Sequence, residues 1–175
     1  MSTTLLYGLI LAITQIVVNL VSYFLGYQTD HIANGRWFSS LAPLIVMIVV
    51  LALGIKAVRE EQPGKGLSYG KGVGTGALIT LYSCIIGSIY AYIHLTYVNP
   101  NFGDYAIEAA RVDWVAKGMT EPQMEGAEKF MRGLFNPKTQ AIVAFVMGGI
   151  FGVVISLIAS AFLKREPVAT SSVSA

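Results

Sequence analysis

The chain has 175 residues, of which 54% are apolar and only 13% carry a charge. Charged residues make up about a quarter of a typical soluble domain, so this composition excludes an ordinary globular protein. The net charge of +2 gives no basis for binding nucleic acid, and the single cysteine, Cys84, excludes an intrachain disulfide.

Four stretches hold almost no charged residues, and each is long enough to cross a membrane. About 20 helical residues span the hydrocarbon core of a bilayer, which is about 30 Å thick. We therefore expect an all-α, polytopic membrane protein in which residues 1–165 form one domain with four transmembrane helices. The first stretch lacks the basic start and the cleavage site of a signal peptide, so we interpret it as a retained span. The four stretches are residues 5–27, 37–58, 72–98 and 137–163.

The first span carries a stripe of small and amide side chains at intervals of three and four residues. This spacing places them on one face of a helix. Small residues let helices approach closely, and amides can form hydrogen bonds between helices where water is absent. We interpret the stripe as a helix-packing face, and a polar path lining a substrate site is the alternative. Its members are Gly8, Ala12, Gln15, Asn19, Ser22 and Gly26.

A short connection over residues 28–36 leads to the second span. Its residues Asp30 and His31 are too few to form a metal site, and His31 is expected to be solvated. Tyr27 and Trp37 flank the connection, as expected of an aromatic belt at a membrane interface.

The turn over residues 59–71 is basic and rich in glycine. Its glycines lack the spacing of a phosphate-binding loop, and no predicted strand precedes them, so we do not expect nucleotide binding. Basic side chains at the edge of a membrane can contact anionic lipid headgroups. The candidates for such contacts here are Lys56, Arg59, Lys65 and Lys71.

The third and fourth spans carry small residues at intervals close to four. This pattern permits a close crossing of membrane helices, so we expect these two spans to pack against each other. The third span contributes Gly72, Gly76, Thr80, Ser83 and Gly87, and the fourth contributes Gly148, Gly152, Ser156 and Ser160.

His94 lies near the end of the third span, among several tyrosines. The simplest interpretation is an interfacial residue in an aromatic belt. A role in proton relay or ligand binding is the alternative, because histidine titrates near neutral pH.

Residues 99–136 form a sizeable segment between the third and fourth spans. We predict a helix over residues 104–117 that ends at Gly118, and a second helix that starts at Thr120 with Gln123 completing a capping box. This short helical hairpin is expected to lie on the membrane surface or over the end of the bundle. Binding of a partner protein is its functional alternative.

Four spans place both termini on the same side as the turn over residues 59–71. Basic residues on that side lie in short segments next to the spans, where they orient insertion most strongly. We therefore expect both termini in the cytoplasm and residues 99–136 on the opposite side. The serine-rich tail, residues 166–175, is expected to be disordered.

Several short motifs together resemble a known family. Residues 54–59 (GIKAVR) close the second span, and residues 67–72 (LSYGKG) open the third. Residues 97–102 (YVNPNF) follow the third span, and Asn136-Pro137 leads into the fourth. With these motifs the chain resembles, over nearly its whole length, small inner-membrane proteins that are frequent in Bacteroidota and known as domain of unknown function 4199. The resemblance implies a four-helix protein of the bacterial inner membrane, and it implies no activity. In that membrane, the orientation expected from the basic residues places residues 99–136 in the periplasm.

The motifs of the chain supply neither a nucleophile with its base nor a set of metal ligands. We therefore expect no enzyme activity, no cofactor and no metal. The small-residue faces exceed what one helix pair requires, which favours a non-catalytic accessory or scaffold subunit of a membrane assembly. Its expected partners are membrane lipids and another membrane protein or a second copy of the chain. The alternative is a small transporter or channel acting as a homo-oligomer, although no charge lies deep in any predicted span.

Overall fold

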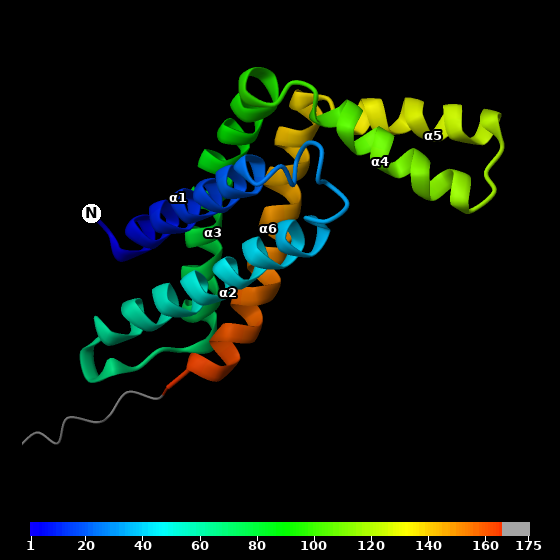
Figure 1. Cartoon of the computed structure of the whole chain (residues 1–175). Helices are drawn as coiled ribbons and strands as arrows, with labels where there is room; N and C mark the ends of the chain where they lie inside the picture. Colours follow the sequence, from blue (N-terminus) through cyan, green and yellow to red (C-terminus); the bar gives the residue numbers. More distant parts are fainter. Residues whose placement is uncertain (166–175) are drawn as a thin grey trace, which may run out of the picture.

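The computed structural model describes residues 1–165, and the predicted disordered tail lies outside them. It confirms an all-α fold with four long apolar helices and a short helix pair between the third and the fourth (Figure 1). The long helices are α1 (Thr3–Phe24), α2 (Arg36–Glu60), α3 (Tyr69–Ile93) and α6 (Pro137–Leu163), and each is long and apolar enough to cross a membrane. The other segments are η1 (Pro63–Lys65), η2 (His94–Val98), α4 (Phe102–Ala116) and α5 (Glu121–Leu134).

Side-chain caps explain where several of these helices begin. The Ser2 hydroxyl accepts a hydrogen bond from the Leu5 amide at 3.3 Å and starts α1. Asn136 Oδ1 accepts one from the Lys138 amide at 3.0 Å and starts α6, in which proline holds the first position. Such caps satisfy amide donors that have no partner inside the helix.

The first long helix ends at Phe24, three residues before the predicted boundary at Tyr27. Gly26 adopts a left-handed backbone conformation with φ of 77°. The Gly26 amide donates to the Tyr23 carbonyl, and the Tyr27 amide donates to the Ser22 carbonyl, both at 2.9 Å. This pair of bonds is a Schellman cap, which ends a helix where glycine permits a positive φ.

Helix α3 lies at the centre of the bundle and packs against α1, α2 and α6. The residues of the buried core come from all four long helices and meet near mid-length. They close the interior of the bundle at this level, while Leu, Ile, Val and Phe side chains cover its outer faces. The core residues are Leu11, Val50, Leu51, Ile79 and Ile155.

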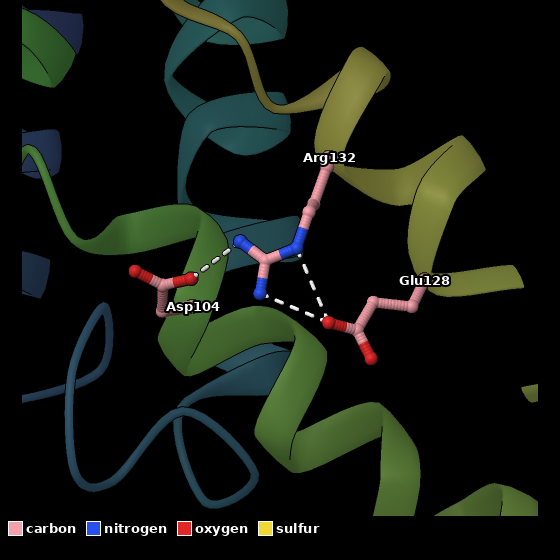
Figure 2. Close-up of polar contacts among 3 residues, drawn as sticks. All are labelled: Asp104, Glu128 and Arg132. Carbon is pink, nitrogen blue, oxygen red and sulfur yellow. Dashed lines mark hydrogen bonds and ion pairs between the residues drawn. The ribbon is translucent and has the colours of Figure 1, made fainter. Parts of the chain in front are cut away.

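The α4–α5 hairpin extends to one side of the bundle instead of lying flat against it (Figure 1). Ile107 and Met124 are buried between its helices. Arg132 on α5 bridges Asp104 on α4, at 2.8 Å, and Glu128 one turn earlier, at 2.9 Å (Figure 2). These two carboxylates raise the pKa of the Arg132 guanidinium above its usual range, so the bridge keeps its charge.

The predicted start of α5 is confirmed. The Thr120 amide donates to Gln123 Oε1 at 2.9 Å, as a capping box requires. Gly118 follows the end of α4 with a φ of 71°, which suits glycine. The sequence therefore encodes both ends of the turn that joins the two helices.

Candidate functional site

A partly enclosed cavity of 620 Å³ lies at the end of the bundle next to the hairpin. The cavity is lined on one side by the halves of α1, α2, α3 and α6 that lie nearest the hairpin. Helix α4 and the end of α5 line the other side. Ligand cavities usually measure about 300–1,000 Å³ and have apolar walls with a few polar groups. This cavity fits that description: its walls include Ile16, Ile32, Leu95, Phe102 and Ala109, together with Gln15, Asn19, Gln28, Tyr90 and His94.

Four of the polar side chains form one hydrogen-bonded group, which we call the histidine cluster: Asn19, Gln28, Tyr90 and His94. His94 Nε2 lies 2.9 Å from Gln28 Oε1, and His94 Nδ1 lies 3.1 Å from the Tyr90 hydroxyl. The Tyr90 hydroxyl lies 3.0 Å from Asn19 Oδ1. Gln28 Nε2 donates to the Asn19 carbonyl at 3.0 Å. The cluster therefore joins α1, the loop after it and α3.

The hydrogen bonds of the cluster define one proton position. Gln28 uses its amide nitrogen on the Asn19 carbonyl, so its Oε1 accepts, and His94 must carry a proton on Nε2. A neutral imidazole accepts at Nδ1 and competes with Asn19 Oδ1 for the single proton of the Tyr90 hydroxyl, whereas a cationic imidazole donates from Nδ1 and leaves that proton on Asn19 Oδ1. The charge on His94 thus influences the direction of the Tyr90 hydroxyl.

The structure corrects the expectation that His94 is interfacial. Its side chain is only 2% exposed, and it points into the bundle toward Gln28. The ring of Tyr23 packs edge-on against it, with ring centroids 5.5 Å apart. Trp37 and Tyr97, by contrast, are exposed at the same end, as an aromatic belt requires.

A π-helical turn positions His94 at the end of the third span. The Asn99 amide donates to the His94 carbonyl at 2.8 Å, which is the i to i+5 bond of this turn. The Asn99 side chain donates to the Gln28 carbonyl at 3.1 Å. Single π-helical turns are frequent at functional sites because they re-aim a side chain without ending the helix.

Two further contacts build the wall between α1 and α2. Gln15 Nε2 donates to the Pro43 carbonyl at 2.8 Å, and the hydroxyls of Ser22 and Ser39 lie 2.9 Å apart. Gln15 and Ser22 belong to the small and amide stripe of the first span. The stripe residues Gln15, Asn19 and Ser22 therefore contact neighbouring segments and also line the cavity, and a substrate path along them stays a prediction.

A pair of opposite charges stands at the rim of the cavity. Arg36 Nη2 at the start of α2 lies 3.3 Å from Asp113 Oδ2 near the end of α4. Both side chains are more than half exposed. Beyond the far end of the cavity the buried core closes the bundle, with Leu11, Leu51 and Ile79 fully buried. The cavity therefore opens at the hairpin end.

The small residues of α3 and α6 face each other along one seam. A Cβ on Gly72 would lie 3.0 Å from Ser160 Cβ, and one on Gly76 would lie 2.6 Å from Ser156 Cβ. A Cβ on Gly152 would lie 2.8 Å from Thr80 Cβ, and one on Gly148 would lie 2.9 Å from Cys84 Sγ. Such approaches bring two backbones together without a bulky side chain between them.

Four other predicted packing residues lie apart from this seam. Gly8 packs against α3, where a Cβ would lie 2.7 Å from Tyr82 Cβ, and Ala12 is fully buried beside it. Gly87 lines the cavity, and within residues 1–165 nothing lies within 4 Å of its Cβ position. Ser83 is buried on α3.

The four basic residues predicted to contact lipid headgroups lie at the opposite end of the bundle. Lys56 is exposed on α2. Arg59 pairs with Glu60 at 2.8 Å, and Lys65 pairs with the same carboxylate at 3.2 Å. Lys71 Nζ donates to Gln62 Oε1. Three of the four therefore also hold the turn between α2 and α3 together.

Sequence reasoning missed Gln28, Asn99 and the pair of Arg36 with Asp113. Gln28 lies in a connection where the sequence shows nothing but a short polar loop. The sequence suggests that a buried His94 would bond to an amide side chain. The loop after the first span has no periodic pattern, however, so the sequence does not show which of its side chains points into the bundle.

The described part of the chain, residues 1–165, contains no group of three or more His, Cys, Asp or Glu side chains that could hold a metal ion. A protein-family model described as "Protein of unknown function (DUF4199)" matches residues 6–165. The chain has no significant match among curated proteins or solved structures.

Proposed function

Because the chain belongs to the DUF4199 family, whose description assigns no activity, we propose a function from the geometry: a non-catalytic accessory or scaffold subunit of a membrane assembly. The observation that carries this proposal is the α4–α5 hairpin. It stands out from the bundle (Figure 1), and Arg132 joins its two helices by pairing with Asp104 and with Glu128. An arm of this kind suits contact with a neighbouring membrane protein.

The outer surface of the hairpin supports this use. Val112, Val115 and Phe130 are 69%, 63% and 71% exposed, although they belong to an extramembrane segment rich in charged residues. Exposed apolar side chains rimmed by polar residues are typical of protein or membrane interaction sites. We propose another membrane protein as the occupant, with a second copy of the chain or the lipid surface as outcomes that the experiment below separates.

The chemistry of the cavity favours a non-catalytic role. Both ring nitrogens of His94 are engaged, one by Gln28 and one by Tyr90. Cys84 lies against Gly148 on the α3–α6 seam and does not line the cavity. The Tyr90 hydroxyl lies within hydrogen-bond reach of His94 Nδ1, but it is also bonded to Asn19 Oδ1, so we propose that this pair holds the cluster together and does not activate a nucleophile.

We propose a bacterial inner-membrane location with both termini in the cytoplasm and residues 99–136 in the periplasm. The turn between α2 and α3 supports it, because its basic residues crowd next to the spans. Arg165, after α6, pairs with Leu67 beside the same turn, so Lys164 and Arg165 add to that basic end. In a Cys84→Ala background, a membrane-impermeant thiol reagent should label Lys117→Cys from the periplasm and should leave Lys65→Cys unlabelled. The reverse pattern would contradict this orientation.

Site-specific photo-crosslinking in native membranes tests the accessory role. A photoreactive residue in place of Phe130 should join the chain to one foreign membrane protein. The same residue in place of Ile158, exposed on α6, is the matched control and should capture only lipid. Capture of lipid alone at Phe130 would contradict the proposal. Capture of a second copy of the chain would favour self-association instead.

A second function, a small transporter acting as a homo-oligomer, is favoured by one observation. The cavity opens at one end and holds a polar cluster at its wall, as expected of a transporter with its opposite side closed. A channel through a single chain is disfavoured because the buried core closes the bundle below the cavity. Flux into vesicles that changes with Asn19→Leu while assembly stays intact would favour transport.

A further inference from the structure

The cavity at the hairpin end has the depth of one leaflet of a bilayer. Along α1, the distance from Phe24 back to the lining residue Gln15 is about 14 Å, and along α2 the distance from Arg36 to Pro43 is about 10 Å. A hydrocarbon core is about 30 Å thick. Measured from these helix ends, the cavity therefore reaches less than half the thickness of a hydrocarbon core, and the buried core lies beyond it.

The cavity is reached from the outer surface at the hairpin end. Several lining residues are also exposed on the outer surface: Ser40 on α2, Ala144 on α6 and Asp113 on α4. Because Ser40 and Ala144 are exposed lining residues on α2 and α6, an acyl chain from the adjacent leaflet could reach the cavity past these two helices. The walls include apolar residues such as Leu95, Phe102 and Ala109, against which an acyl chain can pack.

The rim adds a specific chemical pattern. Arg36 and Asp113 stand 3.3 Å apart, so the rim carries one positive and one negative charge side by side. A guanidinium binds a phosphate through paired hydrogen bonds, and a carboxylate binds a primary ammonium. An anionic headgroup would satisfy Arg36 and leave Asp113 opposed to its charge, whereas a headgroup with both charges complements both residues.

We propose that this cavity binds one zwitterionic phospholipid with a primary ammonium, such as phosphatidylethanolamine. One acyl chain enters the cavity between α2 and α6. The phosphate lies on Arg36, and the ammonium lies on Asp113. The histidine cluster forms the wall beside the chain and keeps the loop after α1 folded against the cavity. Lipid binding at this site does not require the partner protein proposed for the hairpin.

Native mass spectrometry of the purified full chain in mild detergent tests the proposal. The delipidated protein is titrated separately with phosphatidylethanolamine, phosphatidylcholine and phosphatidylglycerol of the same acyl composition. We expect one tightly bound phosphatidylethanolamine per chain. Phosphatidylcholine, whose quaternary ammonium has no N–H to donate, and phosphatidylglycerol should each bind about tenfold more weakly, the effect of one lost charge-assisted hydrogen bond.

Two kinds of variant separate the headgroup from the chain. Arg36→Gln and Asp113→Asn should each weaken phosphatidylethanolamine binding about tenfold. Arg111→Gln breaks an exposed ion pair of the same hairpin, with Glu121, that does not line the cavity, so it should leave binding unchanged. Ala109→Leu fills the cavity without changing the rim and should reduce the binding of all three lipids, with an unchanged melting temperature in the absence of lipid.

The proposal would be overturned by equal binding of the three lipids, or by rim variants that bind phosphatidylethanolamine as the parent does. Binding that survives Ala109→Leu would place the acyl chain elsewhere and would overturn the cavity as its site. Co-purification of a non-lipid molecule that phosphatidylethanolamine cannot displace would also contradict it.

Discussion

His94 Nε2 donates a hydrogen bond to Gln28 Oε1 at 2.9 Å, and this contact joins the end of α3 to the loop that follows α1. Both side chains are at least nine-tenths buried. The bond therefore holds a surface loop against the interior of a membrane bundle, and the cavity at the hairpin end depends on it for one of its walls.

Removing either partner should leave a buried polar group without its hydrogen bond. We expect His94→Leu and Gln28→Leu each to lower the free energy of unfolding by about 1–3 kcal/mol. The double variant should lose less than the sum of the two, which is the mark of a direct interaction. Denaturation of the detergent-solubilised protein measures this, and the exposed His31→Leu in the same loop serves as the control. Strictly additive losses would contradict a direct bond.

Gly76 and Ser156 define the tightest constraint on the crossing of α3 and α6. A methyl group at Gly76 would lie 2.6 Å from Ser156 Cβ, so Gly76→Ala should force the helices apart and cost about 1–3 kcal/mol of stability. Gly74→Ala on the same helix meets nothing within 4 Å among residues 1–165, so it should be neutral or stabilise by up to about 1 kcal/mol. Equal melting temperatures for the two variants would show that α3 and α6 pack less closely at Gly76 than they do in the structure.

A substitution at Thr80 is expected to keep or raise the stability of the protein. It is buried against Gly152, and its hydroxyl has no hydrogen-bond partner within residues 1–165. Thr80→Val keeps the shape and removes the unpaired polar atom, so stability should hold or rise by about 1 kcal/mol. Thr75→Val is the comparison, because the Thr75 hydroxyl donates to the Lys71 carbonyl at 2.8 Å. A clear loss in Thr80→Val, matching that of Thr75→Val, would mean that the Thr80 hydroxyl finds a partner after all.

Arg132 fixes how α5 lies on α4 (Figure 2). Arg132→Gln removes the charge that Asp104 and Glu128 share, so amide hydrogen exchange in α5 should accelerate while exchange in the four long helices stays the same. Lys129→Gln removes a charge from the same helix and should leave exchange unchanged. Uniform protection of α5 in Arg132→Gln would show that Ile107 and Met124 hold the hairpin without the ion pairs.

The spans could be predicted because lipid imposes one simple rule on sequence, a long helical run without charge. The predicted start and end of the fourth span, 137–163, are those of α6. The first span ends early for a local reason, since Gly26 permits a left-handed turn that hydropathy does not register. The α3–α6 seam follows from spacing for Gly72, Gly76 and Thr80, where a four-residue interval repeats on one face, but that interval continues to Cys84 and not to the predicted Ser83 and Gly87.

The cavity could not be predicted, because it depends on contacts between distant segments. Gln28 turns inward only because Asn19, His94 and Asn99 converge on it from α1 and from the end of α3. The pairing of Arg36 with Asp113 depends on the direction in which the hairpin extends from the bundle. The sequence pattern of α4 and α5 does not predict that direction.

The measurement that tests the accessory role most directly is extraction from native membranes in mild detergent, followed by sizing and quantitative mass spectrometry. We predict a particle larger than one chain, with a foreign membrane protein at fixed stoichiometry, that dissociates in Phe130→Ser and persists in Ile158→Ser. A particle that contains this chain alone, as a monomer or as a homo-oligomer, would contradict the accessory role.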